Sequence, residues 1–95
     1  MNHKFAKVGV ESDTRIHQSY VRQFGKYEVL YQVWDWDGAV KGESLIFCKE
    51  DVSDLSLDEL ENLVGESDLC TRAESITVKE SHGYVFVNFD FEMLE

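Results

Sequence analysis

The sequence predicts an α+β domain that is mainly an antiparallel sheet with one helix. Two pairs of apolar, alternating segments flank the turn sequences Asp37-Gly38 and His82-Gly83, which is typical of β-hairpins. Between these hairpins, residues 57–64 have the apolar spacing and end signals of an α-helix. The chain has 95 residues and contains no proline-rich or repetitive linker, so we expect one domain, 1–95.

The first quarter of the chain gives the weakest pattern. Lys4 to Val10 alternates as a strand does. In residues 14–24 the apolar side chains are four apart, which fits a helix or the alternate inward positions of a strand. The β-branched and aromatic content favours a strand, and Gly25-Lys26 would turn it back on the next one. We therefore expect a four-stranded meander, then the helix, then a C-terminal β-hairpin.

The Asp37-Gly38 sequence predicts a two-residue turn. That turn would pair Trp34 with Lys41 and Leu30 with Leu45. One face of this hairpin is then nearly all apolar and should be core, namely Tyr27, Val29, Tyr31, Val33, Val40, Ile46 and Cys48. The other face mixes polar side chains with large apolar ones, namely Leu30, Trp34, Trp36, Leu45 and Phe47.

The helix has signals at both ends. Ser56 is the predicted N-cap, and Glu59 three residues later completes a capping box. Leu55 and Leu60 occupy the positions of a hydrophobic staple, and Gly65 marks the end. The predicted apolar stripe consists of Leu57, Leu60, Leu63 and Val64.

The C-terminal hairpin has regular period-two alternation. A turn at His82-Gly83 pairs Val78 with Val87 and Ile76 with Phe89. The predicted core face consists of Ile76, Val78, Val85, Val87, Phe89, Phe91 and Met93.

The charge of the chain restricts its partners. Nine Lys and Arg against nineteen Asp and Glu give a net charge of -10. Residues 50–95 contain thirteen of the acidic residues and only two basic ones. Direct binding to nucleic acid or to an anionic membrane is unfavourable for such a chain. A basic protein is the partner that this charge favours.

The acidic residues concentrate in one segment, which is the main candidate for a partner-binding site. Residues 50–68 contain no Lys or Arg. Their carboxylates, held by a capped helix and its flanking loops, could imitate the phosphates of a nucleic acid. Ordinary solvated acidity and favourable interaction with the helix dipole explain the same pattern without a partner. The candidate residues are Glu50, Asp51, Asp54, Asp58, Glu59, Glu61, Glu66 and Asp68.

Trp34 and Trp36 are the second candidate for partner contact, because tryptophan is enriched at interface hot spots. Burial in a second core layer is the competing explanation, and we expect most of this face to be buried.

No motif indicates catalysis or metal binding. Asp35-Trp36-Asp37-Gly38 lacks the rest of a calcium loop, and the three histidines are scattered. Cys48 and Cys70 are expected to be ordinary buried thiols. We expect no enzymatic activity, no catalytic residue, no cofactor and no metal. The start of the chain lacks a signal-peptide core, and its apolar runs are short, so the cytoplasm is the expected location.

The functional hypothesis is a small acidic inhibitor that docks its carboxylates on a basic nucleic-acid-binding protein or nuclease. In composition alone, the chain resembles the phage anti-restriction and anti-CRISPR proteins that act as DNA mimics. The location would then be the cytoplasm of a bacterial host. One alternative is an immunity protein that neutralises a cognate toxin, with more energy from aromatic anchors. Another is a small ligand-binding or structural/assembly domain, and the chain could be a monomer or a homodimer.

Overall fold

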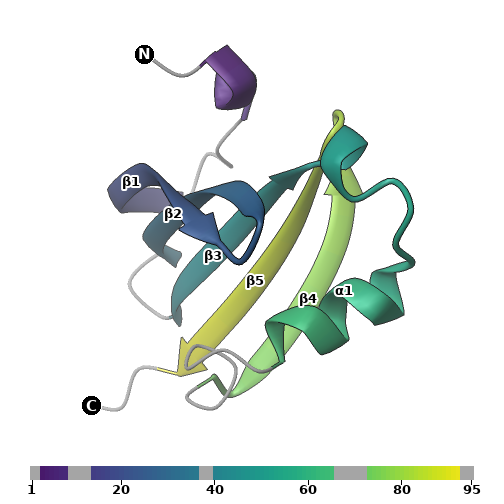
Figure 1. The fold of residues 1–95 in the computed structure, drawn as a ribbon. Helices are drawn as coiled ribbons and strands as arrows, with labels where there is room; N and C mark the ends of the chain where they lie inside the picture. Colours follow the sequence, from purple (N-terminus) through teal and green to yellow (C-terminus); the bar gives the residue numbers. More distant parts are fainter. Residues whose placement is uncertain (1–2, 9–13, 37–39, 66–72, 93–95) are drawn as a thin grey trace.

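The fold is α+β, a five-stranded antiparallel sheet with one α-helix on one face, as the sequence predicts (Figure 1). The computed structural model describes residues 3–8, 14–36, 40–65 and 73–92. The elements in chain order are the 3-10 helix η1 (His3–Phe5), β1 (Thr14–Phe24), β2 (Tyr27–Trp36), β3 (Val40–Cys48), the 3-10 helix η2 (Lys49–Asp51), α1 (Leu57–Val64), β4 (Ser75–Ser81) and β5 (Tyr84–Glu92).

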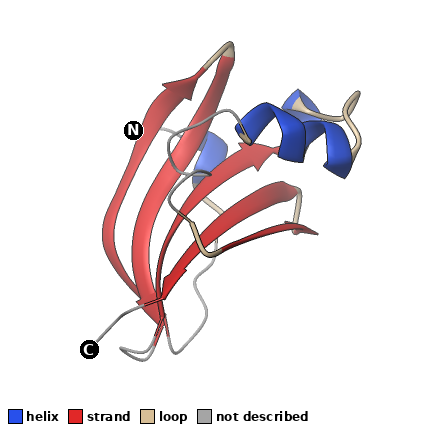
Figure 2. Cartoon of the chain, turned by 90° about the horizontal axis from the view of Figure 1, so that it is seen from below, coloured by secondary structure: helices blue, strands red, loops and turns tan. Residues whose placement is uncertain are grey.

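The order of the strands in the sheet is β1-β2-β3-β5-β4. Because β5 pairs antiparallel with both β3 and β4, these two strands run parallel to each other. The chain passes from β3 through η2 and α1 to β4, and β5 then lies between β3 and β4 in the sheet. Figure 2 shows the curved sheet with α1 on its concave side.

The core lies mainly between α1 and the sheet. Alternate residues of β2, β3 and β5 point towards the helix, because side chains on one strand alternate between faces. Leu60 and Val64 of α1 are buried against them. The members of this cluster are Val29, Leu45, Phe47, Val52, Leu60, Val64, Val85, Val87 and Phe89.

A smaller cluster covers part of the opposite face. The ring of Phe5, from η1, stacks on Tyr84 with the centroids 6.1 Å apart. Phe5 packs there with Leu30, Ile46 and Cys48, and all of these side chains are buried. The tyrosine hydroxyl donates to the carbonyl of Lys4 at 2.9 Å, which attaches the N-terminal segment to β5.

Two of the three predicted hairpin turns are confirmed. Residues 14–24 form a strand, and Gly25-Lys26 turns it into β2 with Phe24 opposite Tyr27. Gly25 has a φ of 60°, which suits the first position of a type II′ turn. Likewise, His82 has a φ of 52°, and the pairing of β4 with β5 has the predicted register.

The predicted register of the middle hairpin is wrong by one residue. Trp36 pairs with Val40, so three residues rather than two separate β2 from β3. Trp34 therefore faces Gly42 instead of Lys41, and Leu30 faces Ile46 instead of Leu45. A one-residue shift exchanges the two faces of a strand. Consequently Leu45 and Phe47 lie under the helix, whereas Ile46 and Cys48 lie on the opposite face. The turn residues Asp37 and Gly38 lie outside the described residues.

The predicted N-terminal strand is also wrong, since η1 and a turn occupy residues 3–7. The described part of the meander therefore has three strands. The physical reason is tertiary, because burial of Phe5 against Tyr84 and hydrogen bonds to Lys4 and Lys7 hold this segment. Residues 9 and 10 lie outside the described part of the chain, as does Met93 of the predicted C-terminal core face.

The helix has the predicted bounds, and its capping box is present. The predicted apolar stripe is only half correct. Leu60 and Val64 are buried, but 48% of Leu57 and 37% of Leu63 is exposed. These two leucines lie at the flanks of the buried stripe, which is narrower than the spacing of the leucines suggests. Gly65 ends the helix as its C-cap in a right-handed conformation, with a φ of -62°.

Candidate functional site

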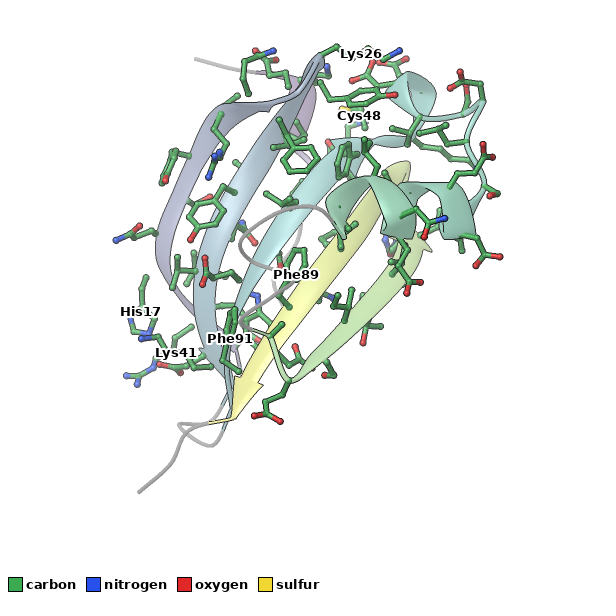
Figure 3. All side chains as sticks on the ribbon, turned by 60° about the horizontal axis from the view of Figure 1, so that its bottom comes forward. His17, Lys26, Lys41, Cys48, Phe89 and Phe91 are labelled. Atoms are coloured by element: carbon green, nitrogen blue, oxygen red, sulfur yellow. The ribbon has the colours of Figure 1, made fainter. Side chains whose placement is uncertain are left out.

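The acidic segment lies on η2, on the loop that follows it, and on α1. Local backbone hydrogen bonds hold this connection. The N–H of Val52 donates to the carbonyl of Lys49 at 3.1 Å, and the N–H of Leu55 donates to the carbonyl of Val52 at 3.0 Å. Val52 and the buried residues of α1 belong to the same core cluster. The same core therefore holds both the loop and the helix in place. Figure 3 shows η2 and α1 along the same side of the sheet.

The start of the helix is rigid because its capping box is complete. The Ser56 hydroxyl accepts the backbone N–H of Glu59 at 3.1 Å. In return, the Glu59 carboxylate accepts the backbone N–H of Ser56 at 3.0 Å. One of the predicted partner-binding carboxylates, Glu59, thus has a structural role.

Besides Glu59, four of the predicted carboxylates are displayed to solvent without a counter-charge. Each is exposed, and none forms an ion pair with another residue of the described ranges. Asp58 and Glu61, three apart on the helix, are neighbours of like charge, which costs a few tenths of a kcal/mol. We call these four residues the acidic surface, which consists of Glu50, Asp54, Asp58 and Glu61.

Asp51 does not fit this pattern. Its carboxylate is 2.5 Å from the ammonium of Lys4, and both side chains are partly buried. The hydrogen bond with Asp51 raises the pKa of Lys4, because it stabilises the charged ammonium. This pair neutralises the carboxylate and attaches η1 to η2. Glu66 and Asp68 lie outside the described residues.

The predicted tryptophan site is separate from the acidic surface. Trp34 is half-buried on the face opposite α1, and its indole N–H donates to the Ser44 hydroxyl at 2.8 Å. The Ser44 hydroxyl in turn donates to the Asn88 side-chain carbonyl at 2.6 Å. The ring lies across Gly42, where a Cβ atom would be only 2.3 Å from it. Trp34 therefore has a packing role, and the side chain of Trp36 lies outside the described part.

Sequence reasoning did not find a charged cluster at the far end of β1 and β2. The carboxylate of Asp35 is nearly buried, and His17 Nε2 lies 2.6 Å from its Oδ2. Arg15 Nε lies 3.4 Å from the other oxygen. The hydrogen bond with His17 and then the one with Arg15 hold the pKa of Asp35 below its ordinary value. The register skips at His17, which is a β-bulge, and no sequence signal marks this bulge.

A second group that the sequence did not reveal lies on the helix-bearing face of β1–β3. The rings of Tyr20 and Tyr31 are 5.2 Å apart, and the Arg22 guanidinium lies 5.6 Å from the centroid of Tyr31. The hydroxyl of Tyr31 donates to the carboxylate of Glu43. Burial and this hydrogen bond raise the pKa of Tyr31.

An open cleft of 550 Å³ lies beside η2 and contains a buried thiol. Burial raises the pKa of Cys48, so the thiol stays protonated and is a poor nucleophile. Cys70 lies outside the described ranges. The residues that line the cleft are Lys4, Cys48, Lys49, Glu50, Ser53, His82, Gly83 and Tyr84.

Among the described residues, no group of three or more His, Cys, Asp or Glu side chains is arranged to hold a metal ion. No helix in the described ranges has the length and apolar character needed to cross a membrane. No protein-family profile, curated protein or solved structure matches the chain.

Proposed function

We propose that this domain binds a basic protein through the acidic surface and inhibits it, in the manner of a nucleic-acid mimic. The target would be a nucleic-acid-binding protein or a nuclease. The observation that carries the proposal is that Glu50, Asp54, Asp58 and Glu61 are exposed and have no counter-charge among the described residues.

The geometry of the helix supports this function. Asp58 and Glu61 are separated by about 4.5 Å along the helix axis. One strand of a DNA duplex presents a phosphate about every 3.4 Å. Because the capping box and the buried residues Leu60 and Val64 hold α1, little conformational entropy is lost when the surface docks.

An immunity protein against a basic toxin is the second candidate, and the exposed leucines favour it. Leu57 and Leu63 flank the buried stripe of α1 and remain 48% and 37% exposed. Apolar anchors beside charged groups are typical of protein–protein interfaces, whereas imitation of phosphates requires none. In this second case Leu57→Ala weakens binding more than any single carboxylate substitution does.

The test begins with affinity capture from lysate, elution in steps of rising salt, and identification of the eluted proteins. Binding of the captured protein to its own nucleic acid is then measured against increasing amounts of the domain. The proposal predicts competition by the wild type and its loss in the Asp58→Lys/Glu61→Lys variant. We expect a loss of at least tenfold in affinity, since interfacial charge pairs contribute about 1.5 kcal/mol or more.

The matched control is Glu28→Lys/Asp90→Lys, which changes the net charge equally. These two residues lie on the face of the sheet opposite α1, because each is next in sequence to a residue, Val29 or Phe89, that packs under α1. Equal loss of competition in both variants would indicate an effect of net charge and not a specific surface. A partner that binds the domain and its nucleic acid simultaneously would contradict inhibition by mimicry.

A further inference from the structure

The outer edge of β1 is the longest uncovered strand edge in the described part of the sheet. β1 has eleven residues and pairs with β2 on one side only. In Figures 1 and 3 this strand forms the border of the sheet farthest from α1. Most of its side chains are exposed. An unpaired edge can accept another extended segment.

The register of the hairpin shows which backbone groups this edge offers. Phe24 and Tyr27 close the two-residue turn and so form the hydrogen-bonded pair next to it. In an antiparallel ladder, hydrogen-bonded and non-hydrogen-bonded pairs alternate. The residues whose N–H and C=O groups point away from β2 are therefore Ser19, Val21 and Gln23.

The charge of this edge is opposite to that of the molecule. Residues 14–26 contain Arg15, Arg22 and Lys26 but no Asp or Glu, in a chain with a net charge of -10. Neither Arg22 nor Lys26 forms an ion pair with a described residue. The adjacent strands of a sheet are about 4.8 Å apart. Four such steps, about 19 Å along the sheet, separate β1 from β4, the strand that α1 contacts.

Side chains beside the edge form a platform for an added strand. Tyr20 is 48% exposed, and its ring lies against Tyr31. Arg22, two residues after Tyr20 on the same face of β1, lies over the same Tyr31 ring. Every second side chain of an added strand would lie beside Tyr20 and Arg22 on the same face of the sheet, which favours acidic and apolar residues at those positions.

Pairing of β1 with a second copy of itself is less favourable. The β-bulge at His17 interrupts the ladder, and bulges and basic residues on edge strands are the means by which proteins avoid self-association. The regular part, residues 18–24, remains long enough for a short peptide. We propose that this part of β1 binds an extended acidic segment of a partner protein, which adds to the sheet as a sixth strand. This site is distinct from the acidic surface.

The experiment uses two synthetic heptapeptides, Thr-Glu-Val-Glu-Thr-Glu-Val and its counterpart with Lys at each Glu position. Affinity is measured by fluorescence anisotropy, and amide protection is followed residue by residue by hydrogen exchange. The proposal predicts that the acidic peptide binds and protects the amides of Ser19, Val21 and Gln23. The basic peptide should bind at least tenfold more weakly.

Two pairs of variants test the backbone and the charge separately. Ser19→Pro removes one outward N–H and should lower the affinity at least tenfold. Ser19→Ala is its control, because both variants lose the Ser19 hydroxyl that accepts from Gln32. Arg22→Glu should also lower the affinity for the acidic peptide. Lys79→Glu, on the opposite edge strand, should bind this peptide as tightly as the wild type does.

Each other outcome counts against the proposal. Equal binding of Ser19→Pro and Ser19→Ala would show that no strand is added. Equal affinity for the two peptides, protection at other strands, or no binding of the acidic peptide would overturn it. A concentration-dependent dimer that protects the β1 amides without peptide would show that a second copy is the occupant. None of these results depends on the acidic surface.

Discussion

The close approach of Trp34 to Gly42 gives the sharpest prediction about stability. The indole lies so near the backbone that a Cβ atom at residue 42 would be 2.3 Å from Cζ2 and 2.5 Å from Cη2 of the ring. Gly42 does not have a positive φ, so alanine is compatible with its backbone. Gly42→Ala therefore acts only by displacing the indole from β3.

The expected cost combines two effects. Overpacking of a filled site costs about 1–3 kcal/mol. Displacement of the ring also breaks its 2.8 Å hydrogen bond to Ser44, for about 1 kcal/mol more. The sum is about 2–4 kcal/mol, which lowers Tm by roughly 10–30 °C in a domain of this size. Urea unfolding followed by far-UV circular dichroism measures this loss in the free energy of unfolding.

A double-mutant cycle with Trp34→Ala tests the mechanism. Once the indole is absent, Gly42→Ala should be neutral or stabilise by up to about 1 kcal/mol, because alanine restricts the unfolded chain. An equal cost of Gly42→Ala in both backgrounds would refute the assignment of Trp34 to this position.

Three further predictions concern α1 and Asp35. In urea titrations, Ser56→Ala should lower the free energy of unfolding by about 1 kcal/mol. Ser56→Asp should have nearly the wild-type free energy of unfolding, because aspartate is also a good N-cap. Leu60→Ala should cost about 2–5 kcal/mol, whereas Leu57→Ala, at a half-exposed position, should change stability far less in the same titrations. The pKa of Asp35 is lower in the folded than in the unfolded protein, so its contribution is complete above about pH 4 and disappears as the pH falls below that value. The stability difference between the wild type and Asp35→Asn should therefore shrink below about pH 4, and a constant difference in acid titrations would contradict the interaction with His17 and Arg15.

The elements with strong local signals could be predicted from the sequence. The capping box at Ser56 and Glu59 fixes the start of α1 by itself. The His82-Gly83 turn joins two strands that each have a continuous apolar face towards α1, so only one register buries both of these faces together.

The register of the middle hairpin could not be predicted in this way. Residues 45–48 are four consecutive apolar residues, so a shift of one position buries a similar amount of apolar surface on either face. The number of turn residues decides between the registers, and the Asp-Gly pair indicated two where the structure has three.

Long-range contacts account for the other differences. The position of η1 depends on contacts of Phe5 and Lys4 with Tyr84, about eighty residues away. Exposure of Asp58 and Glu61 followed from the helical pattern, because they lie away from Leu60 and Val64. The pairing of Asp51 with Lys4 could not be predicted, since it requires the same long-range placement of η1.

The most direct test of the proposed function is the salt dependence of affinity for the captured partner, compared between the wild type and Asp58→Lys/Glu61→Lys. Binding that rests on outward carboxylates weakens steeply as salt rises. We predict a steep dependence for the wild type, a clearly smaller one for the variant, and an unchanged one for Glu28→Lys/Asp90→Lys. The same affinity and the same salt dependence in all three proteins would contradict a role for the helix carboxylates in binding.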